Sequence, residues 1–362
     1  MSIRFLIAGG ITIDTLIGLD SDKENTGELA SRGQNMVEES RQGGIVVCGG
    51  NAVYAGIGAA IWADRPGDIG LVACLGAGYP GSWIDELRAT RLDLAGVRVL
   101  SEPHALAFQA IYDRLGRRRE QQVVHEMGGT ANSAGAARDN TSEVRARFLP
   151  MVDDRLPRGY LQAEAALCSQ YRLDKQHEAC VYLHERGIRI FLDPDEIQSA
   201  QLSPGQLRRF LEPVDVFLPS EKEIPVFMRR YPPFRSERIV RRMERYGPTV
   251  VALKLGRRGS MVYDRMSRST WRFPAPADRV LDPTGAGDAY CGGFMVGYIQ
   301  TGDACEAALR ATVSASFVIE SVGALPALEA LPVLRQEAPE RLEQLRRLLH
   351  GRLSGGSLGT TA

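Results

Sequence analysis

The sequence predicts an α/β protein built on a mostly parallel central sheet. Short apolar runs alternate with segments of helical pattern along most of the chain, which is typical of strand–helix–strand units. A glycine-rich turn around residue 285 leads directly into an apolar helix. The 362 residues, 44% of them hydrophobic, are enough for one large core.

The alternation predicts an order of elements. Strands are expected at residues 1–10, 69–74, 97–100, 163–169, 188–193 and 248–255, a returning pair at 261–263 and 271–273, and a hairpin within 105–127. Helices are expected at residues 49–63, 81–90, 289–299, 307–321 and 340–349. Small residues dominate the helix at 49–63, so it is expected to pack very closely on the sheet.

Polar segments interrupt this order. Residues 20–43 are expected to form a loop or part of a lid, and residues 128–158 an irregular stretch. The tail at 351–362 is rich in Gly, Ser and Thr and is expected to be disordered. An arginine-rich stretch at 223–246 has the apolar spacing of surface helices, and a nucleic-acid groove is the alternative.

Composition excludes several classes of function. Lys+Arg and Asp+Glu number 44 each, so no electrostatic role at nucleic acid or membrane is indicated. The six cysteines contain no Cys-x-x-Cys and are expected to be buried, reduced thiols. No apolar run approaches the roughly 20 residues of a membrane span, and the N-terminus lacks the pattern of a secretory signal. A soluble, cytoplasmic protein is expected.

Residues 284–287, Thr284-Gly285-Ala286-Gly287, form what we call the anion turn. Their small side chains let backbone N–H groups converge, and the N-terminus of the helix that follows is electropositive. The turn is therefore expected to bind a negative group. Asp288 stands at its lip, where a carboxylate is a poor phosphate ligand but can accept the proton of an attacking hydroxyl.

The turn alone leaves a second interpretation open. Gly-x-Gly turns also open ordinary helices, and Asp is common at helix starts because it caps free N–H groups. Two familiar phosphate motifs do not fit. The chain has no Gly-x-x-x-x-Gly-Lys-Ser/Thr, and a dinucleotide fingerprint would need its third glycine at Tyr290.

Residues 282–288, Asp-Pro-Thr-Gly-Ala-Gly-Asp, followed by Gly292-Gly293-Phe294, resemble the C-terminal signature of the ribokinase-like, PfkB-type carbohydrate and nucleoside kinases. The resemblance covers roughly residues 3–330. It implies a three-layer α/β/α sandwich with a mostly parallel central sheet and a small β lid. The kinase domain would span residues 1–335, with lid segments near 12–48 and 98–127 and a C-terminal helix at 336–350.

Two N-terminal segments extend the resemblance to the substrate side. Residues 7–14 resemble a first strand that ends in a substrate-binding aspartate, here Asp14, although a turn-capping role is the alternative. Residues 48–52 resemble the diglycine segment beneath the sugar. The resemblance thus implies a substrate site made of Asp14, Gly49, Gly50, Asn51 and Tyr54.

Later segments resemble the nucleotide side. Residues 217–223 are similar to the family's Asn-x-x-Glu segment, and residues 251–259 to its nucleotide-side strand and turn. The implied cofactor-binding residues are Ser220, Glu223, Lys254, Gly256, Gly259, Thr284 and Gly323. Glu223 would assist Mg²⁺ through water, which suits an ion that keeps several waters. Asp282 and Thr284 are candidates for holding a monovalent cation such as K⁺.

The chain departs from the family pattern at four places. Ser220 replaces the Asn of Asn-x-x-Glu, Tyr54 replaces an Asn that contacts sugar, Ala77 and Gly78 fill a turn that often holds Asp, and Thr312 replaces an Asn. These changes bear on the identity of the acceptor more than on phosphoryl transfer. Tyr54 can stack on a base or simply fill core space.

The implied activity is ATP-dependent phosphorylation of a hydroxyl on a small sugar or sugar derivative. Asp288 would act as the base, and the backbone N–H groups of Gly285, Ala286, Gly287 and Asp288 would stabilise the transferring group. The alternatives are a nucleoside kinase of the same family and a catalytically silent sugar- or nucleotide-binding relative. A lid would exclude water. Lid-to-lid dimers occur in relatives, so a homodimer is expected.

Overall fold

The structure is a computed structural model. It describes residues 2–17, 38–39, 44–112, 118–123, 146–169, 172–194, 202–224, 236–276 and 279–354. Several predicted segments therefore lie wholly or partly outside the described residues: most of 20–43, residues 128–145, residues 225–235 within the arginine-rich stretch, and the tail from residue 355.

A nine-stranded sheet runs through the described part of the chain in the order β14-β13-β12-β11-β10-β9-β1-β5-β6. Its strands are β1 (Phe5–Gly9), β5 (Ile69–Ala77), β6 (Leu92–Pro103), β9 (Ala165–Ser169), β10 (Arg189–Leu192), β11 (Val216–Phe217), β12 (Val250–Lys254), β13 (Ser260–Asp264) and β14 (Ser269–Phe273). All neighbours from β6 to β12 pair in parallel, whereas β12–β13 and β13–β14 are antiparallel. The predicted mostly parallel sheet and its returning pair are confirmed.

Alternate residues of each central strand enter different cores, because successive side chains of a strand point to opposite faces. In β1, Phe5 and Ile7 join one buried cluster, whereas Leu6 and Ala8 join another. Both faces of the sheet are thus covered, which explains why the strands are apolar without interruption. This is the three-layer arrangement that the family resemblance implied.

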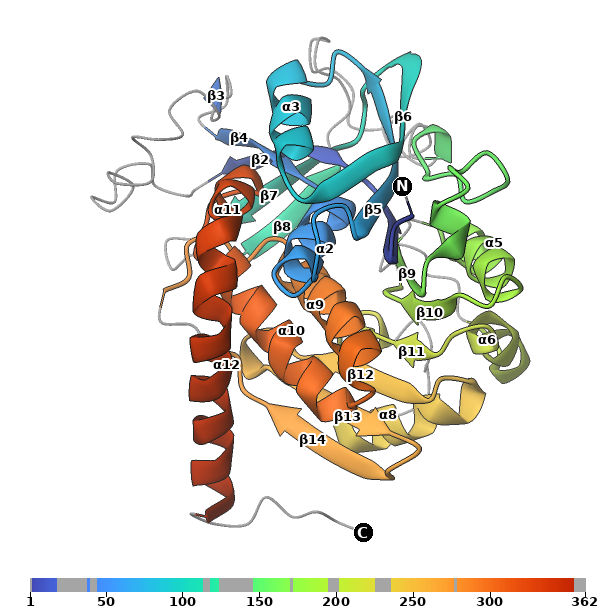
Figure 1. The fold of residues 1–362 in the computed structure, drawn as a ribbon, viewed down its shortest axis with the longest axis vertical. Helices are drawn as coiled ribbons and strands as arrows, with labels where there is room; N and C mark the ends of the chain where they lie inside the picture. Colours follow the sequence, from blue (N-terminus) through green and yellow to red (C-terminus); the bar gives the residue numbers. More distant parts are fainter. Residues whose placement is uncertain are drawn as a thin grey trace.

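Helices cover the two faces (Figure 1). One face is covered by α2 (Asn51–Ala60), α3 (Gly81–Ala89), α9 (Ala286–Thr301), α10 (Ala304–Val318), α11 (Leu325–Glu329) and α12 (Leu331–Ser354). The other is covered by α5 (Leu173–His184), α6 (Pro204–Leu211) and α8 (Ser236–Met243). Single 3-10 turns occur at η1 (Tyr160–Gln162), η2 (Glu244–Tyr246) and η3 (Gly256–Arg258).

A second sheet of five strands lies beside the main one and corresponds to the predicted lid; in the described residues its order is β3-β4-β2-β7-β8. Its strands are β2 (Thr12–Ile17), β3 (Glu38–Glu39), β4 (Ile45–Gly49), β7 (Ala107–Tyr112) and β8 (Arg118–Val123). The sheet is mixed, since β2 pairs in parallel with β7 and antiparallel with β4. Asp14 lies within β2. It does not end the first strand of the main sheet, as the sequence had suggested, because the chain turns at Gly10 and starts a new strand.

Helix α2, which is rich in small residues, packs closely on helix α9 as well as on the sheet. A Cβ placed on Gly58 would lie 2.1 Å from the carbonyl oxygen of Ala289, and one on Gly292 would lie 1.9 Å from that of Ala55. No side chain larger than hydrogen fits at either position. This close approach fixes the start of α9 against α2, and the anion turn lies at that start.

The C-terminal helix α12 is longer than predicted and continues through Pro339. Ala338, Leu342 and Leu345 are buried in the core at helical spacing, so packing offsets the hydrogen bond that proline removes.

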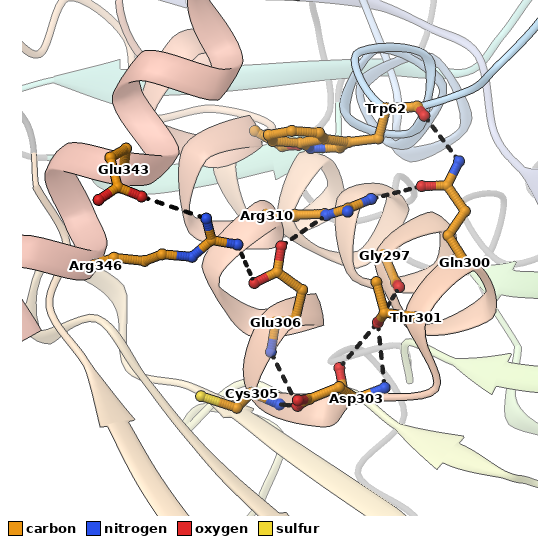
Figure 2. Close-up of polar contacts among 11 residues, drawn as sticks. Trp62, Gly297, Gln300, Thr301, Asp303, Cys305, Glu306, Arg310, Glu343 and Arg346 are labelled. Atoms are coloured by element: carbon orange, nitrogen blue, oxygen red, sulfur yellow. Dashed lines mark hydrogen bonds and ion pairs between the residues drawn. The ribbon is translucent and has the colours of Figure 1, made fainter.

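A polar network holds α12 against α10 (Figure 2). Glu306 of α10 accepts from Arg310 at 3.1 Å and from Arg346 of α12 at 2.6 Å. The guanidinium of Arg310 lies over the Trp62 ring, 5.2 Å from its centroid. The network therefore ties the end of α2 to both C-terminal helices.

All six cysteines are free in the structure, and five of them are buried. Among the described helices, none combines the length and the apolar composition that crossing a membrane requires.

His104 provides a test of the packing between the two sheets. Its Nδ1 accepts from the amide of Gly76 at 3.0 Å, so Nε2 carries the proton and donates to the carbonyl of Leu106. Burial lowers the pKa of His104 to about 4. The unfolded chain takes up a proton near pH 6.5, but the folded chain does not. The contribution of His104 to the free energy of unfolding should therefore fall by about 3 kcal/mol as pH drops from 6.5 to 4.

Urea unfolding at several pH values measures this slope. His104→Gln cannot titrate and should flatten it, whereas His184→Gln at the exposed end of α5 should leave it unchanged. An unchanged slope in His104→Gln would contradict the assignment.

Candidate active site

The anion turn has the shape that the sequence predicts. Gly285 has a left-handed conformation, with φ of 78°, and caps helix α9 with its backbone alone. Gly285 has no side chain that could cap this helix end, and residues 285–287 line a cavity, so their small side chains leave the first N–H groups of the helix accessible to a ligand. A Cβ on Gly285 would lie 2.2 Å from the ring of Tyr54. Glycine is thus required there both by conformation and by space.

Asp288 lies in the first turn of α9 and lines a cavity of about 680 Å³. The residue is half-buried. The cavity is lined by Asp14, by the anion turn and by Ile319, among others. Its volume is in the range of sites that bind small ligands and cofactors. Asp288 and the amides of the turn share one wall, which is the geometry that base catalysis beside an anion site needs.

Asp14 is nearly fully buried, 5% exposed, and lines this cavity. Its Oδ1 accepts a hydrogen bond from Thr12 at 2.6 Å. A Cβ on Gly49 would lie 2.0 Å from Oδ2 of Asp14, so Gly49 makes room for the carboxylate and does not itself line the cavity. Gly49 is thus required by the packing of Asp14, whereas Gly50 is required by its φ of 103° and by the backbone of Gly10.

Asn51 lines the cavity, but its side chain also holds backbone. Its Oδ1 accepts from the amide of Gly10 at 2.6 Å, and its Nδ2 donates to the carbonyl of Ser169. These bonds join the end of β1 to the end of β9. The side chain therefore fixes the floor beneath the predicted acceptor position, a role that its place in the sequence did not reveal.

Tyr54 lines the cavity, and its hydroxyl is buried. The side chain is 2% exposed, and its hydroxyl has no hydrogen-bond partner among the described residues. Burial, and then the nearby charges of Asp282 and Asp14, raise the pKa of Tyr54 well above its usual value. The hydroxyl of Ser169, which also lines the cavity, is likewise unpartnered in the described part of the chain. A buried polar group without a partner is costly, so both are candidates for ligand contact.

Lys254 lies beneath the anion turn. A Cβ on Gly287 would be 3.7 Å from its Nζ. The ammonium forms a 2.6 Å ion pair with Asp193, and Cys291 donates to the other oxygen of that carboxylate at 3.2 Å. Burial disfavours the charged amine, but Asp193 outweighs it and the pKa of Lys254 is raised. Asp193 was not among the predicted site residues. Its position could have indicated a site, because a carboxylate at the carboxyl end of a buried parallel strand lies where α/β sheets bind their ligands.

Glu223 lies next to this pair and is 7% exposed. Burial raises its pKa to about 7, although Lys254 and the amide of Ser220, which donates to Glu223 at 2.5 Å, both favour its charged form. The backbone of Ser220 forms a parallel β-bridge with that of Lys254, so the Ser-x-x-Glu segment lies beside the end of β12. The hydroxyl of Ser220 has no partner in the described residues. Gly256 and Gly259 form the turn that follows, both with positive φ, and line the cavity.

Asp282 lies behind the anion turn, 1% exposed and away from the cavity wall. Its Oδ1 accepts from Tyr112 at 2.7 Å and from the amide of Thr284 at 2.9 Å, and its Oδ2 from the amide of Gly323 at 3.3 Å. Three protein donors thus satisfy the carboxylate that the resemblance assigned to a monovalent cation. A cation on this side chain would have to share the carboxylate with these three donors.

A magnesium ion would be held in the cavity in a different way. No group of three or more His, Cys, Asp or Glu side chains that could hold a metal occurs among the described residues. An ion that is bound mainly by phosphates and water needs no such cage. Glu223, buried on the cavity wall, is the side chain that would face it.

The structure therefore brings most of the predicted residues together. One cavity is lined by Asp14, Gly50, Asn51, Tyr54, Ser220, Glu223, Lys254, Gly256, Gly259, Thr284, Gly285, Ala286, Gly287 and Asp288. Gly49, Asp282 and Gly323 support it from behind.

Known proteins resemble the chain in sequence and in fold. Residues 157–331 match the model of the pfkB family carbohydrate kinases. The cytidine kinase of Thermococcus kodakarensis is 23% identical over 296 residues, which are 81% of this chain and 87% of that protein. The structure of Burkholderia thailandensis nucleoside kinase in complex with inosine superposes with a TM-score of 0.66 at 18% identity, covering 94% of this chain and 97% of that one. The structure of Arabidopsis thaliana ribokinase complexed with ribose and ATP superposes with a TM-score of 0.63 at 18% identity, covering 92% of this chain and 99% of that one.

Fold and site together define an α/β protein of the ribokinase fold, with a small lid sheet beside its cavity. The matched segment contains the anion turn and Asp288, and the chain resembles PfkB-like carbohydrate and nucleoside kinases in both sequence and fold. The resemblance predicted from the sequence is thereby confirmed.

Proposed function

We propose that the chain transfers the γ-phosphate of ATP to a hydroxyl of a small acceptor that contains a sugar. The observation that carries this proposal is the single cavity that joins Asp14, the anion turn and Asp288. An acceptor held by Asp14 would place a hydroxyl near Asp288, and a nucleotide in the same cavity would bring its last phosphate to the turn.

In the proposed reaction, Asp288 accepts the proton of the acceptor hydroxyl. The hydroxyl oxygen forms a bond to the γ-phosphorus while the bond to the bridging oxygen of ATP breaks, and ADP leaves. The amides of Gly285 to Asp288 hold the negative charge on the transferring group. Lys254 adds a positive charge beneath the turn. Magnesium, when bound to the phosphates, would neutralise part of their charge, with Glu223 holding it through water.

Two observations favour a nucleoside as the second candidate acceptor. Tyr54 and Phe108 place aromatic rings on the cavity wall near Asp14, and aromatic rings suit the face of a base. The cytidine kinase relative and the nucleoside kinase structure point the same way.

A screen of pentoses, hexoses, sugar acids and nucleosides, measured as ADP release, tests the proposal. Release with one class identifies the acceptor. Calorimetry that shows ligand binding, with no ADP release for any acceptor, would instead indicate a silent binding relative.

Tyr54→Phe should separate ligand binding from folding. The substitution removes a buried hydroxyl that has no partner in the described part of the protein, so the free energy of unfolding should stay within about 1 kcal/mol or rise. The KM of the acceptor should rise about 2- to 10-fold if the hydroxyl bonds the ligand. Steady-state kinetics and urea unfolding of the same preparation measure both. Lower stability with an unchanged KM would show that the hydroxyl is structural.

A further inference from the structure

Tyr112 reaches from the lid to the anion turn. It is the last residue of lid strand β7, and its hydroxyl donates to Asp282 at 2.7 Å and lies 2.5 Å from Oγ1 of Thr284. A phenol has one hydrogen, so its oxygen is left to accept from the Thr284 hydroxyl. The side chain is 4% exposed and packs in the lid core with Leu16, Val47 and Ala110.

Asp282 connects this contact to a second one between lid and main domain. Its other oxygen accepts from the amide of Gly323. A Cβ on Gly323 would lie 2.6 Å from Cβ of Val47 on lid strand β4, and the next amide, that of Ala324, donates to the carbonyl of Cys48 at 3.0 Å. One carboxylate thus joins two lid strands, β7 directly and β4 through Gly323, to the segment that leads into α9.

We propose that Tyr112 is a positioning residue for phosphoryl transfer, which holds the anion turn in place through Asp282 and Thr284. The inference rests on the proposed function. Thr284 immediately precedes Gly285, and glycine adopts many conformations unless its neighbours restrain it. The Tyr54 ring restrains Gly285 from one side, and Tyr112 fixes Thr284. Without Tyr112 the amides that stabilise the transferring group would be less well placed.

The test is Tyr112→Phe, which keeps the ring and removes the hydroxyl. We expect kcat to fall about 10- to 100-fold, because small misplacements of groups around a reacting centre have effects of that size. The KM for ATP should change by less than about 3-fold, because the lost restraint acts mainly in the transition state. Tyr160→Phe is the matched control. Its buried hydroxyl bonds the amide of Gly96 and the carbonyl of Asp93, remote from the cavity, and kcat should stay near that of the wild type.

Two further measurements distinguish positioning from general stability. If Tyr112 acts through Thr284, the double variant Tyr112→Phe/Thr284→Val should be no slower than the slower single variant. Amide hydrogen exchange of residues 282–290 should be faster in Tyr112→Phe than in the wild type or in Tyr160→Phe, and it needs no acceptor. A wild-type protein without phosphoryl transfer would therefore refute the proposed function while the exchange still decides whether Tyr112 holds the turn. A folded Tyr112→Phe with wild-type kcat, additive losses in the double variant, or unchanged exchange would overturn the inference.

Discussion

Asp288→Asn should lower turnover by about 10²- to 10⁴-fold while ATP binding is largely retained, which is the contribution expected of a general base. Asparagine has the same size and can still form hydrogen bonds, but it does not accept a proton at neutral pH. Because Asp288 is half-buried on the cavity wall at the start of α9, the change should not disturb the core. ADP release with the acceptor found in the screen, together with calorimetry of ATP binding, measures both quantities.

Asp303→Asn is the matched control for this experiment. Asp303 also lies at a helix start, where its side chain accepts from the amides of Cys305 and Glu306 at the beginning of α10. It does not line the cavity, and Asn caps helices about as well as Asp. Turnover should therefore be unchanged. If Asp288→Asn also keeps wild-type turnover, Asp288 is not the base and serves only the helix.

The fold was predictable from the sequence where the determinants are local. The apolar runs of the parallel strands, the small residues of α2 and the anion turn each carry their structural reason within a few neighbouring residues. The lid pairing was not predictable in this way. β2 pairs in parallel with β7, which lies far from it in the sequence, and no local pattern encodes that partner. The predicted C-terminal helix at 336–350 was too short: α12 spans Leu331–Ser354, and buried side chains on both sides of Pro339 stabilise it.

The candidate site was predictable as a set of residue types but not as a set of contacts. Asp14, the anion turn and Asp288 could be found because their sequence context is distinctive. Asn51 was assigned to the acceptor, whereas its side chain also joins Gly10 to Ser169, a contact that exists only once β1 and β9 are neighbours. Tyr112 gave no sequence signal, since its partner Asp282 lies 170 residues away.

Lys254→Met should reduce the free energy of unfolding by about 3–5 kcal/mol, because it leaves a buried carboxylate without its counter-ion. Methionine keeps much of the aliphatic length of the side chain and removes the charge. Among the described residues, the Asp193 carboxylate would then keep only its hydrogen bond from the Cys291 thiol, with its side chain 9% exposed. Since the Lys254 ammonium lowers the pKa of nearby Glu223, that pKa should rise further above its present value of about 7. Turnover should fall as well, because the positive charge beneath Gly287 is lost.

An exposed ion pair, between Arg258 and Glu221, provides the control for this substitution. Arg258 pairs with Glu221, and their side chains are 49% and 50% exposed, so Arg258→Gln should change stability by less than about 1 kcal/mol. Adding Asp193→Asn to Lys254→Met should recover part of the lost stability, since the uncompensated charge is then removed. Urea unfolding of the four proteins measures these differences. If Lys254→Met were no less stable than Arg258→Gln, water would have to reach the Asp193 carboxylate, and the charge beneath the anion turn would be too well screened to act on a bound phosphate.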